Sequence, residues 1–359
     1  MRDNTILTDR QDSRLFIDIV KGVAIFLMLW GHCIQYCALN DFDFFENPVF
    51  KFIYSFHMPL FMLVSGYLFA FSCRKRDLRT LLVHRTQGLL QPIVFCTMIN
   101  YLLTNVISKR HFANVFSAKW MSELNSLWFL WSVLAASIII GVAYKAPNKR
   151  IMQIIIAVLG FGFVCLFPNA EMNEFMYPYF LIGFIFAYVK DKIPKSIKNI
   201  KYLSLVIFPV LLFFFQKRDY IYTTGLISKE YDIYTLIGID LYRWAIGLIG
   251  SIFVLVILEW FVILMKKAKP LELLGQAISR IGKKSLQIYC FSVSLLSFFL
   301  PKIYGSFCER IVGQNLFAQN MVLYNFLFTP LIAICYALGL YWLIKLIERI
   351  KISKVIFGR

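Results

Sequence analysis

The sequence predicts an all-α integral membrane protein, a bundle of about ten transmembrane helices with both ends of the chain in the cytoplasm. Of its 359 residues, 59% are hydrophobic and 16% are charged, whereas soluble domains average about 25% charged residues. The mean hydropathy is +0.68. Apolar stretches of about 17 to 25 residues, the length that a helix needs to cross the hydrocarbon core, recur along the chain. Lys and Arg cluster in alternate connections between these stretches, as the topology of a membrane protein requires.

Ten apolar segments are the expected spans, and the sixth, seventh and ninth are short, at about 16 residues each. A single membrane domain therefore covers residues 1–359, with residues 1–15 as a cytoplasmic N-terminal segment and residues 348–359 as a cytoplasmic tail. The inner connection 266–284 is predicted to be an amphipathic helix at the membrane interface. The spans are 16–39, 49–71, 86–107, 126–144, 151–167, 174–189, 201–216, 236–265, 285–300 and 323–347.

The distribution of basic residues supports this topology. With the N-terminus in the cytoplasm, most of the 38 Lys and Arg residues fall on the cytoplasmic side. Removing one span would place the basic segments 74–79 and 269–284 on opposite faces of the membrane. The net charge of +18 therefore reflects topology. We expect membrane lipid as a partner of the inner loops, through anionic headgroups, and no nucleic acid.

Three ionisable residues lie on one face of the first span, in the stretch "DIVKGVAIFLMLWGH". Because a helix turns about 100° per residue, Lys21 and His32 are offset by about 20°, and Asp18 lies about 40° to the other side of His32. Lys21 is near the cytoplasmic end, and His32 lies about 16 Å further out. Charged residues within spans usually face the bundle interior and mark a function. The alternative for Asp18 and Lys21 is an ion pair that only aids packing.

Other spans place polar or aromatic residues at the depth of His32. His57 in the second span is about 12 Å below the outer surface, and His32 is about 10 Å below it. In the eighth span, "DLYRWAIG" places Arg243 at a similar depth. In the fourth, "LWFLWSVL" places Trp128, Trp131 and Ser132 in the outer half. The tryptophans could instead anchor the helix at the interface, but convergence of several spans on one layer favours a site.

These residue types suit acyl transfer. Histidine can act as a general base near neutral pH, and a hydroxyl that attacks a thioester needs one. Lysine and arginine can hold an anionic donor. The stretch "CRKRDLRTLLVHR" on the inner side offers such cations, although topology alone explains basic residues there. No spacing typical of a metal site or a soluble enzyme is present, so we expect no metal. The candidate arginines are Arg74, Arg76, Arg79 and Arg85.

Several stretches together resemble the membrane-bound acyltransferase-3 family, and within it the fucose 4-O-acetylase-related group. Spread in order, they cover most of the chain, and the first two are the most specific. The chain departs from the family pattern at Pro92-Ile93, where members often have Pro-Tyr, and at Ser292, where many have histidine. The stretches are "RLFIDIVKGVAIFLMLWGH", "FHMPLFMLVSGYLF", "HRTQGLLQP", "LWFLWSVL" and "IGKKSLQIY".

The resemblance implies ten transmembrane helices, an acyl-CoA donor reached from the cytoplasm and an acceptor on the outer side. Lys21 and His32 match the family's basic residue followed by ten residues and a histidine. Trp131 and Ser132 match its Trp-Ser element, and the Arg74–Arg85 region matches its basic patch. Tyr289, in the ninth span, joins the expected binding residues.

The expected function is an O-acetyltransferase of the bacterial inner membrane. Acetyl-CoA is the expected donor, and a glycan or lipid-linked saccharide is the expected acceptor. His32 would act as general base or carry the acyl group transiently, Asp18 would orient Lys21, and His57 and Arg243 would position a substrate. The alternatives are a transporter or flippase for a glycan or lipid-linked intermediate, with the charged residues along its path, and an inactive relative with a scaffolding role.

Overall fold

The computed structural model describes residues 2–37, 43–108, 116–146, 150–226, 230–292, 320–350 and 356–357, and the regular structure in these ranges is helical. Residues 285–292 form a helical segment after α12. Short turns include η1 (Phe44–Glu46), η2 (Val164–Leu166), η3 (Ile200–Leu203), η4 (Lys217–Asp219) and a π-helical turn, η6 (Tyr324–Phe328). The α-helices are α1 (Arg2–Tyr36), α2 (Pro48–Lys75), α3 (Leu78–Ser108), α4 (Phe116–Ser126), α5 (Trp128–Lys145), α6 (Arg150–Phe163), α7 (Ala170–Val189), α8 (Lys195–Asn199), α9 (Ser204–Phe214), α10 (Ile221–Thr224), α11 (Ile233–Met265), α12 (Lys269–Lys283), α15 (Met321–Leu323) and α16 (Thr329–Arg349).

Within the described residues, six helical stretches are long and apolar enough to cross a membrane. The third and sixth expected spans correspond to α3 and α7, which are not among these six. The polar side chains of Thr97 and Asn100 in α3 and of Asn173 in α7 are buried, as polar side chains within a membrane bundle usually are. The six stretches are Asp12–Tyr36, Pro48–Lys75, Trp128–Lys145, Ser196–Phe214, Ile233–Met265 and Met321–Arg349.

Some boundaries differ from the sequence prediction. The fifth expected span is a helix of only 14 residues, which ends at Phe163 and continues into η2. The connection between the third and fourth expected spans contains α4 (Phe116–Ser126), a helix that the sequence did not predict. The first part of the ninth expected span, 285–292, is helical, and its remainder lies outside the described residues.

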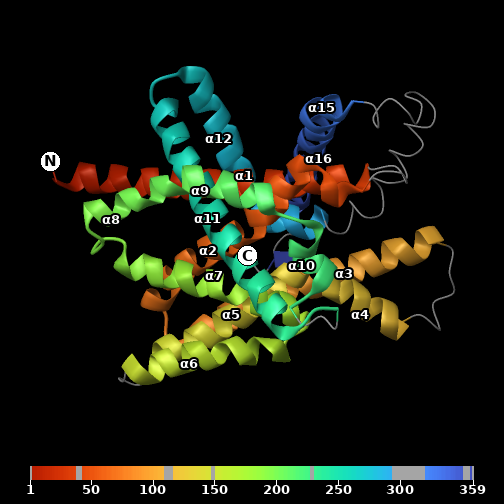
Figure 1. Cartoon of the computed structure of the whole chain (residues 1–359), viewed down its shortest axis with the longest axis horizontal. Coiled ribbons are helices and arrows are strands. Elements are labelled where there is room, and N and C mark those ends of the chain that lie inside the picture. Colours follow the sequence, from red (N-terminus) through yellow and green to blue (C-terminus); the bar gives the residue numbers. More distant parts are fainter. Residues whose placement is uncertain are drawn as a thin grey trace.

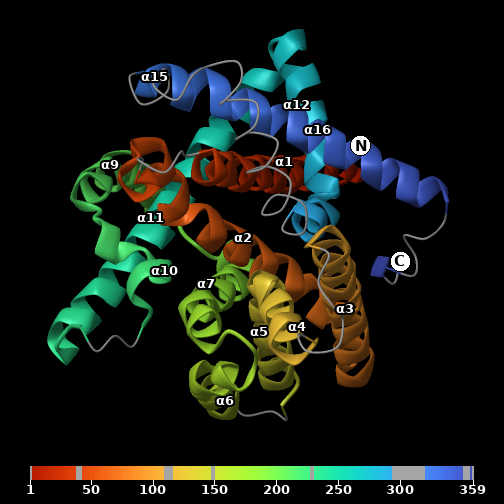
Figure 2. The ribbon, with the colours of Figure 1, turned by 90° about the vertical axis from the view of Figure 1, so that its right-hand side faces the viewer.

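Helix α2 lies in the middle of the bundle, with α1 on one side and α7 and α5 on the other (Figure 2). Two glycines bring α2 and α7 into backbone contact. A Cβ atom on Gly66 would lie 2.0 Å from the carbonyl oxygen of Phe180, and one on Gly183 would lie 2.0 Å from that of Leu63. Small residues at such crossings allow membrane helices to approach closely, and this contact fixes the helix that carries His57.

Helix α12 confirms the helix predicted within residues 266–284, and it packs against α1 (Figure 1). The contact again depends on glycine. A Cβ atom on Gly282 would lie 1.8 Å from the carbonyl oxygen of Asp18, and one on Gly22 would lie 2.2 Å from that of Ile278. The part of α1 that carries Asp18 and Lys21 is therefore covered by α12.

The N-terminal end of α2 is fixed by its N-cap residue, Asn47. Its side-chain oxygen accepts hydrogen bonds from the backbone N–H groups of Val49 (2.9 Å) and Phe50 (3.1 Å), which are unpaired at a helix start. Its amide donates to the side-chain oxygen of Asn325 (2.7 Å), in the π-helical turn before α16. The start of α2 is thus tied to α16, and His57 follows on the same helix.

Candidate active site

A cavity of about 300 Å³ lies where α1 ends and α2 begins. Its walls come from α1, η1, α2, α3, α4, α5, α10 and the helical segment 285–292. Four predicted site residues line it, namely His32, His57, Trp128 and Tyr289. The other lining residues are Met28, Gln35, Tyr36, Phe44, Phe45, Phe50, Tyr54, Met58, Asn100, Ser126 and Tyr222. An aromatic wall with a few polar groups is typical of a small-molecule site.

His32 is placed in the cavity by the last turns of α1. Its Nδ1 atom lies 3.2 Å from the side-chain oxygen of Gln35 and 3.3 Å from the hydroxyl of Tyr54. Its ring stacks on that of Tyr36, with centroids 5.7 Å apart. When Nδ1 carries the proton and donates it to Gln35, the lone pair is on Nε2 and can accept a proton from a substrate.

His57 is 2% exposed, and its hydrogen bond shows which ring nitrogen carries the proton more clearly than the contacts of His32 do. Its Nδ1 atom donates to the backbone carbonyl of Ile53 at 2.8 Å. A carbonyl oxygen only accepts hydrogen bonds, so Nδ1 must carry the proton and the neutral ring has its lone pair on Nε2. The Tyr54 ring lies between the two histidines, 4.8 Å from the His57 ring and 6.2 Å from the His32 ring.

Trp128 and Tyr289 form aromatic walls. The Trp128 ring lies 6.1 Å from that of Tyr222, and the Tyr289 ring lies 5.7 Å from that of Phe129. The sequence analysis missed Tyr54 and Tyr222. The sequence spacing could have indicated Tyr54, because this residue precedes His57 by three positions and therefore lies on the same face of the helix. Tyr222 lies on an outer connection, where no periodic pattern indicates which way a side chain points.

Trp131 and Ser132 are buried outside the cavity. The Trp131 indole donates to the carbonyl of Leu124 at 3.1 Å, which joins α5 to α4. The Ser132 hydroxyl lies 2.8 Å from the side-chain oxygen of Asn173, which joins α5 to α7. The predicted Trp-Ser element therefore supports the cavity walls from behind.

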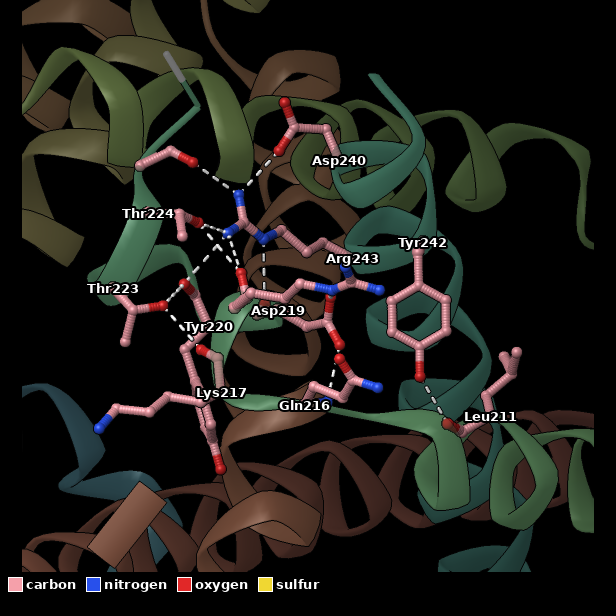
Figure 3. Close-up of polar contacts among 12 residues, drawn as sticks. Leu211, Gln216, Lys217, Asp219, Tyr220, Thr223, Thr224, Asp240, Tyr242 and Arg243 are labelled. Atoms are coloured by element: carbon pink, nitrogen blue, oxygen red, sulfur yellow. Dashed lines mark hydrogen bonds and ion pairs between the residues drawn. The ribbon is translucent and has the colours of Figure 1, made fainter. Parts of the chain in front are cut away.

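Arg243 does not line the cavity with the histidines. Its guanidinium points into the connection between α9 and α11, where it donates to backbone carbonyls and pairs with Asp240 at 2.8 Å (Figure 3). In this connection, burial raises the pKa of Asp219 above its ordinary value. The hydrogen bond from Lys217 lowers the pKa of Asp43 in the connection between α1 and α2. The sequence predicted Arg243 beside the histidines because it lies at a similar depth along its helix. Depth alone does not show which way a side chain points, so this prediction was wrong.

The inner cations have local partners. Lys21 and Asp18 form an ion pair at 2.7 Å, the geometry that the packing alternative also requires. Arg74 donates to the carbonyl of Ala187 at 3.2 Å and lies 4.2 Å from the centre of the Tyr188 ring. The Arg85 guanidinium lies 4.7 Å from the centre of the Phe69 ring.

The remaining two arginines stand where α2 passes into α3. Arg76 is the C-cap of α2, and Arg79, in the first turn of α3, is exposed. In the part of the chain that the structure describes, no three His, Cys, Asp or Glu side chains gather as a metal site needs.

The cavity can support proton transfer from a hydroxyl. Two imidazoles reach it, and one of them has its proton fixed on the side away from the lone pair. General-base catalysis requires a basic atom within hydrogen-bond reach of the proton that it removes. The aromatic walls limit the access of water to such a site.

Comparison with known proteins agrees with this chemistry. The model of the acyltransferase-3 family, described as an acyltransferase domain, matches residues 14–346. Nodulation protein NolL of Mesorhizobium japonicum is 30% identical over 177 residues, which is 48% of each chain. Nodulation protein NolL of Sinorhizobium fredii is 31% identical over 198 residues, which is 53% of each chain. The chain thus spans about half the length of the curated relatives it matches. No solved structure matches it.

Proposed function

The chain belongs to the acyltransferase-3 family, and from that premise we propose that this multi-pass membrane protein is an O-acetyltransferase of the fucose 4-O-acetylase-related group. The donor is acetyl-CoA, bound from the cytoplasm. The acceptor is a hydroxyl of an exported glycan or lipid-linked saccharide, and the membrane is the bacterial inner membrane. Ten spans with both termini in the cytoplasm fit the charge distribution.

The observation that carries this proposal is that His32 and His57 line one cavity. His32 accepts the proton of the acceptor hydroxyl as its oxygen attacks the carbonyl carbon of the thioester. A new C–O bond forms, the C–S bond breaks, and coenzyme A leaves as the thiol once the proton is returned to sulfur. The competing role for His32 is a transient acyl carrier, for which ping-pong kinetics would be the signature.

The donor phosphates are held at the inner ends of the helices. Lys21 lies on the same face of α1 as His32 and about 16 Å from it along the axis, at about 1.5 Å per residue, which is a distance that an extended pantetheine arm can cover. Arg74 and Arg79 have exposed side chains on the same inner side in this topology. Cations of this kind attract and bind phosphate groups. Arg76 and Arg85 lie beside them in sequence and complete the proposed basic surface.

The acceptor side of the cavity is suited to a sugar. Aromatic faces such as those of Trp128 and Tyr222 pack against the C–H face of a sugar ring, and hydrogen-bonding groups nearby hold its hydroxyls. A pocket of about 300 Å³ is at the lower end of the usual range for small-molecule sites.

The proposal is tested by mass spectrometry of exported glycans from cells with the gene, without it, and with His32→Ala. We expect an acetyl-sized mass difference that disappears in both altered strains at equal levels of membrane protein. Identical glycans in all three strains would contradict the proposal. Loss of glycan export without any change in acetylation would support the flippase alternative.

A further inference from the structure

Arg243 is the most heavily bonded side chain outside the cavity in the described structure. Its Nε atom donates to the carbonyl of Asp219 (3.0 Å), and Nη1 donates to that of Gly225 (2.6 Å). Its Nη2 atom donates to the carbonyls of Arg218 (2.7 Å) and Tyr220 (3.2 Å). These acceptors all belong to residues 217–225, which fold around the guanidinium (Figure 3).

The bonding pattern requires arginine. The guanidinium is planar, with five N–H donors in a fixed fork, whereas lysine offers three donors from a single atom. Nη2 also donates to the hydroxyl of Thr224. The side chain is 1% exposed, and Asp240, one turn earlier on α11, pairs with it. Burying a charge is costly unless it is paired and its donors are satisfied, so the segment and Arg243 depend on each other.

The same segment forms part of the cavity wall. Tyr222 lines the cavity, with its ring 6.0 Å from that of Tyr54. The Tyr220 hydroxyl donates to the carbonyl of Phe45 at 3.0 Å, and Phe45 also lines the cavity. Lys217 pairs with Asp43 at 2.7 Å. Residues 217–225 are therefore fastened to Arg243 on one side and to the connection between α1 and α2 on the other.

We propose that Arg243 is a positioning residue for the acceptor. By holding residues 217–225, it fixes Tyr222 in the wall of the cavity that the two histidines also line, and it touches no substrate itself. This inference rests on the proposed acetyl transfer. It adds that the position of Tyr222 determines how well the cavity binds the acceptor. The proposed donor cations are Lys21 on α1 and the arginines where α2 passes into α3. None of them belongs to residues 217–225, so we expect donor binding not to depend on Arg243.

The test compares Arg243→Lys, Tyr222→Ala and the double variant in vesicles, with radiolabelled acetyl-CoA and the exported glycan fraction of the host as acceptor. We expect Arg243→Lys to raise the acceptor KM about tenfold, because a displaced wall misplaces the acceptor, and to change the acetyl-CoA KM less than twofold. The double variant should be no worse than Tyr222→Ala alone, since residues that act through one another are not additive. Glu259→Gln is the matched control, because Glu259 is also on α11 and the substitution removes its ion pair with Lys201 of η3.

Hydrogen exchange of the purified protein provides a second readout. We expect the amides of residues 217–225 to exchange faster in Arg243→Lys, and those of α5 to be unchanged. If Arg243→Lys does not fold, Thr224→Ala is the milder variant. It removes the hydroxyl that accepts from Nη2 of Arg243 and donates to the carbonyl of Arg218, and it should shift the acceptor KM in the same direction by less.

Additive effects in the double variant, or an unchanged acceptor KM in folded Arg243→Lys, would overturn the inference while leaving the transfer reaction intact. Absence of transfer by the wild-type protein would overturn the proposed function and this inference together.

Discussion

The cavity and the basic residues that the sequence predicts on the inner side of the membrane differ in the contacts of their polar side chains. In the cavity, His32, His57 and Trp128 come from three different helices and face one space. At the inner ends, Lys21 is paired with Asp18 on its own helix, and Arg74 contacts the end of α7. Convergence of several helices on one space indicates a site, whereas locally paired cations fit binding or topology equally well. The cavity therefore carries the argument for chemistry, and the inner side needs variants to reveal its role.

The largest effect is expected in the cavity, from His32→Ala. Removing the general base should lower kcat about 10²- to 10⁴-fold, with protein levels and thermal stability close to those of the wild type. The decrease in kcat is measured as the rate at which radiolabelled acetyl groups are transferred to the glycan fraction. A kcat within a factor of about two of wild type would remove His32 from the mechanism and weaken the contrast between the two regions.

His57→Asn separates chemistry from structure in the same cavity. Asparagine can keep an N–H donor near the position of Nδ1, and so the bond to the carbonyl of Ile53, but it has no atom at the position of Nε2. If the Nε2 lone pair takes part in transfer, kcat should fall about 10²-fold. Wild-type kcat in this variant would show that His57 serves only to hold its own helix turn.

On the inner side, Lys21→Gln should raise the KM for acetyl-CoA about tenfold, since a hydrogen bond to a charged group contributes about 1.5–3 kcal/mol. The acceptor KM should not change. Initial rates at varied acetyl-CoA concentration measure the effect. Arg243→Lys is the control, because it should raise the acceptor KM and leave the acetyl-CoA KM nearly unchanged. If Lys21→Gln lowered only thermal stability, the ion pair with Asp18 would be a packing feature and the inner basic ends would lose their assigned role.

The smallest effect is expected behind the cavity wall. Ser132→Ala leaves the side-chain oxygen of Asn173 without its hydroxyl donor and should destabilise the fold by about 1 kcal/mol. Thermal unfolding in detergent should shift down by a few degrees, and kcat should change less than twofold. A large loss of transfer at unchanged stability would instead make Ser132 a substrate-binding residue.

The sequence predicts residues that regular helices place. Depth along a helix follows from the rise of about 1.5 Å per residue, which is why His32 and His57 could be assigned to one layer. Helix α12 was predictable from its amphipathic pattern, but its contact with α1 depends on Gly22 and Gly282 and on a fold that no pattern encodes.

Irregular connections explain most of what the sequence did not reveal. The direction of Arg243 is set by residues 217–225, which turn back onto the guanidinium. Tyr222 enters the cavity from that same segment. Backbone paths of this kind arise from many weak tertiary contacts. Neither the hydropathy nor the helical periodicity of the sequence predicts them.

The central claim is that one cavity receives the acyl group from a donor in the cytoplasm and gives it to an acceptor outside. Right-side-out membrane vesicles loaded with radiolabelled acetyl-CoA and surrounded by the exported glycan fraction test this directly. The account predicts that label appears on the external glycan with the wild-type protein and is absent with His32→Ala. Equal labelling with both proteins, or labelling only when acetyl-CoA is added outside, would contradict it.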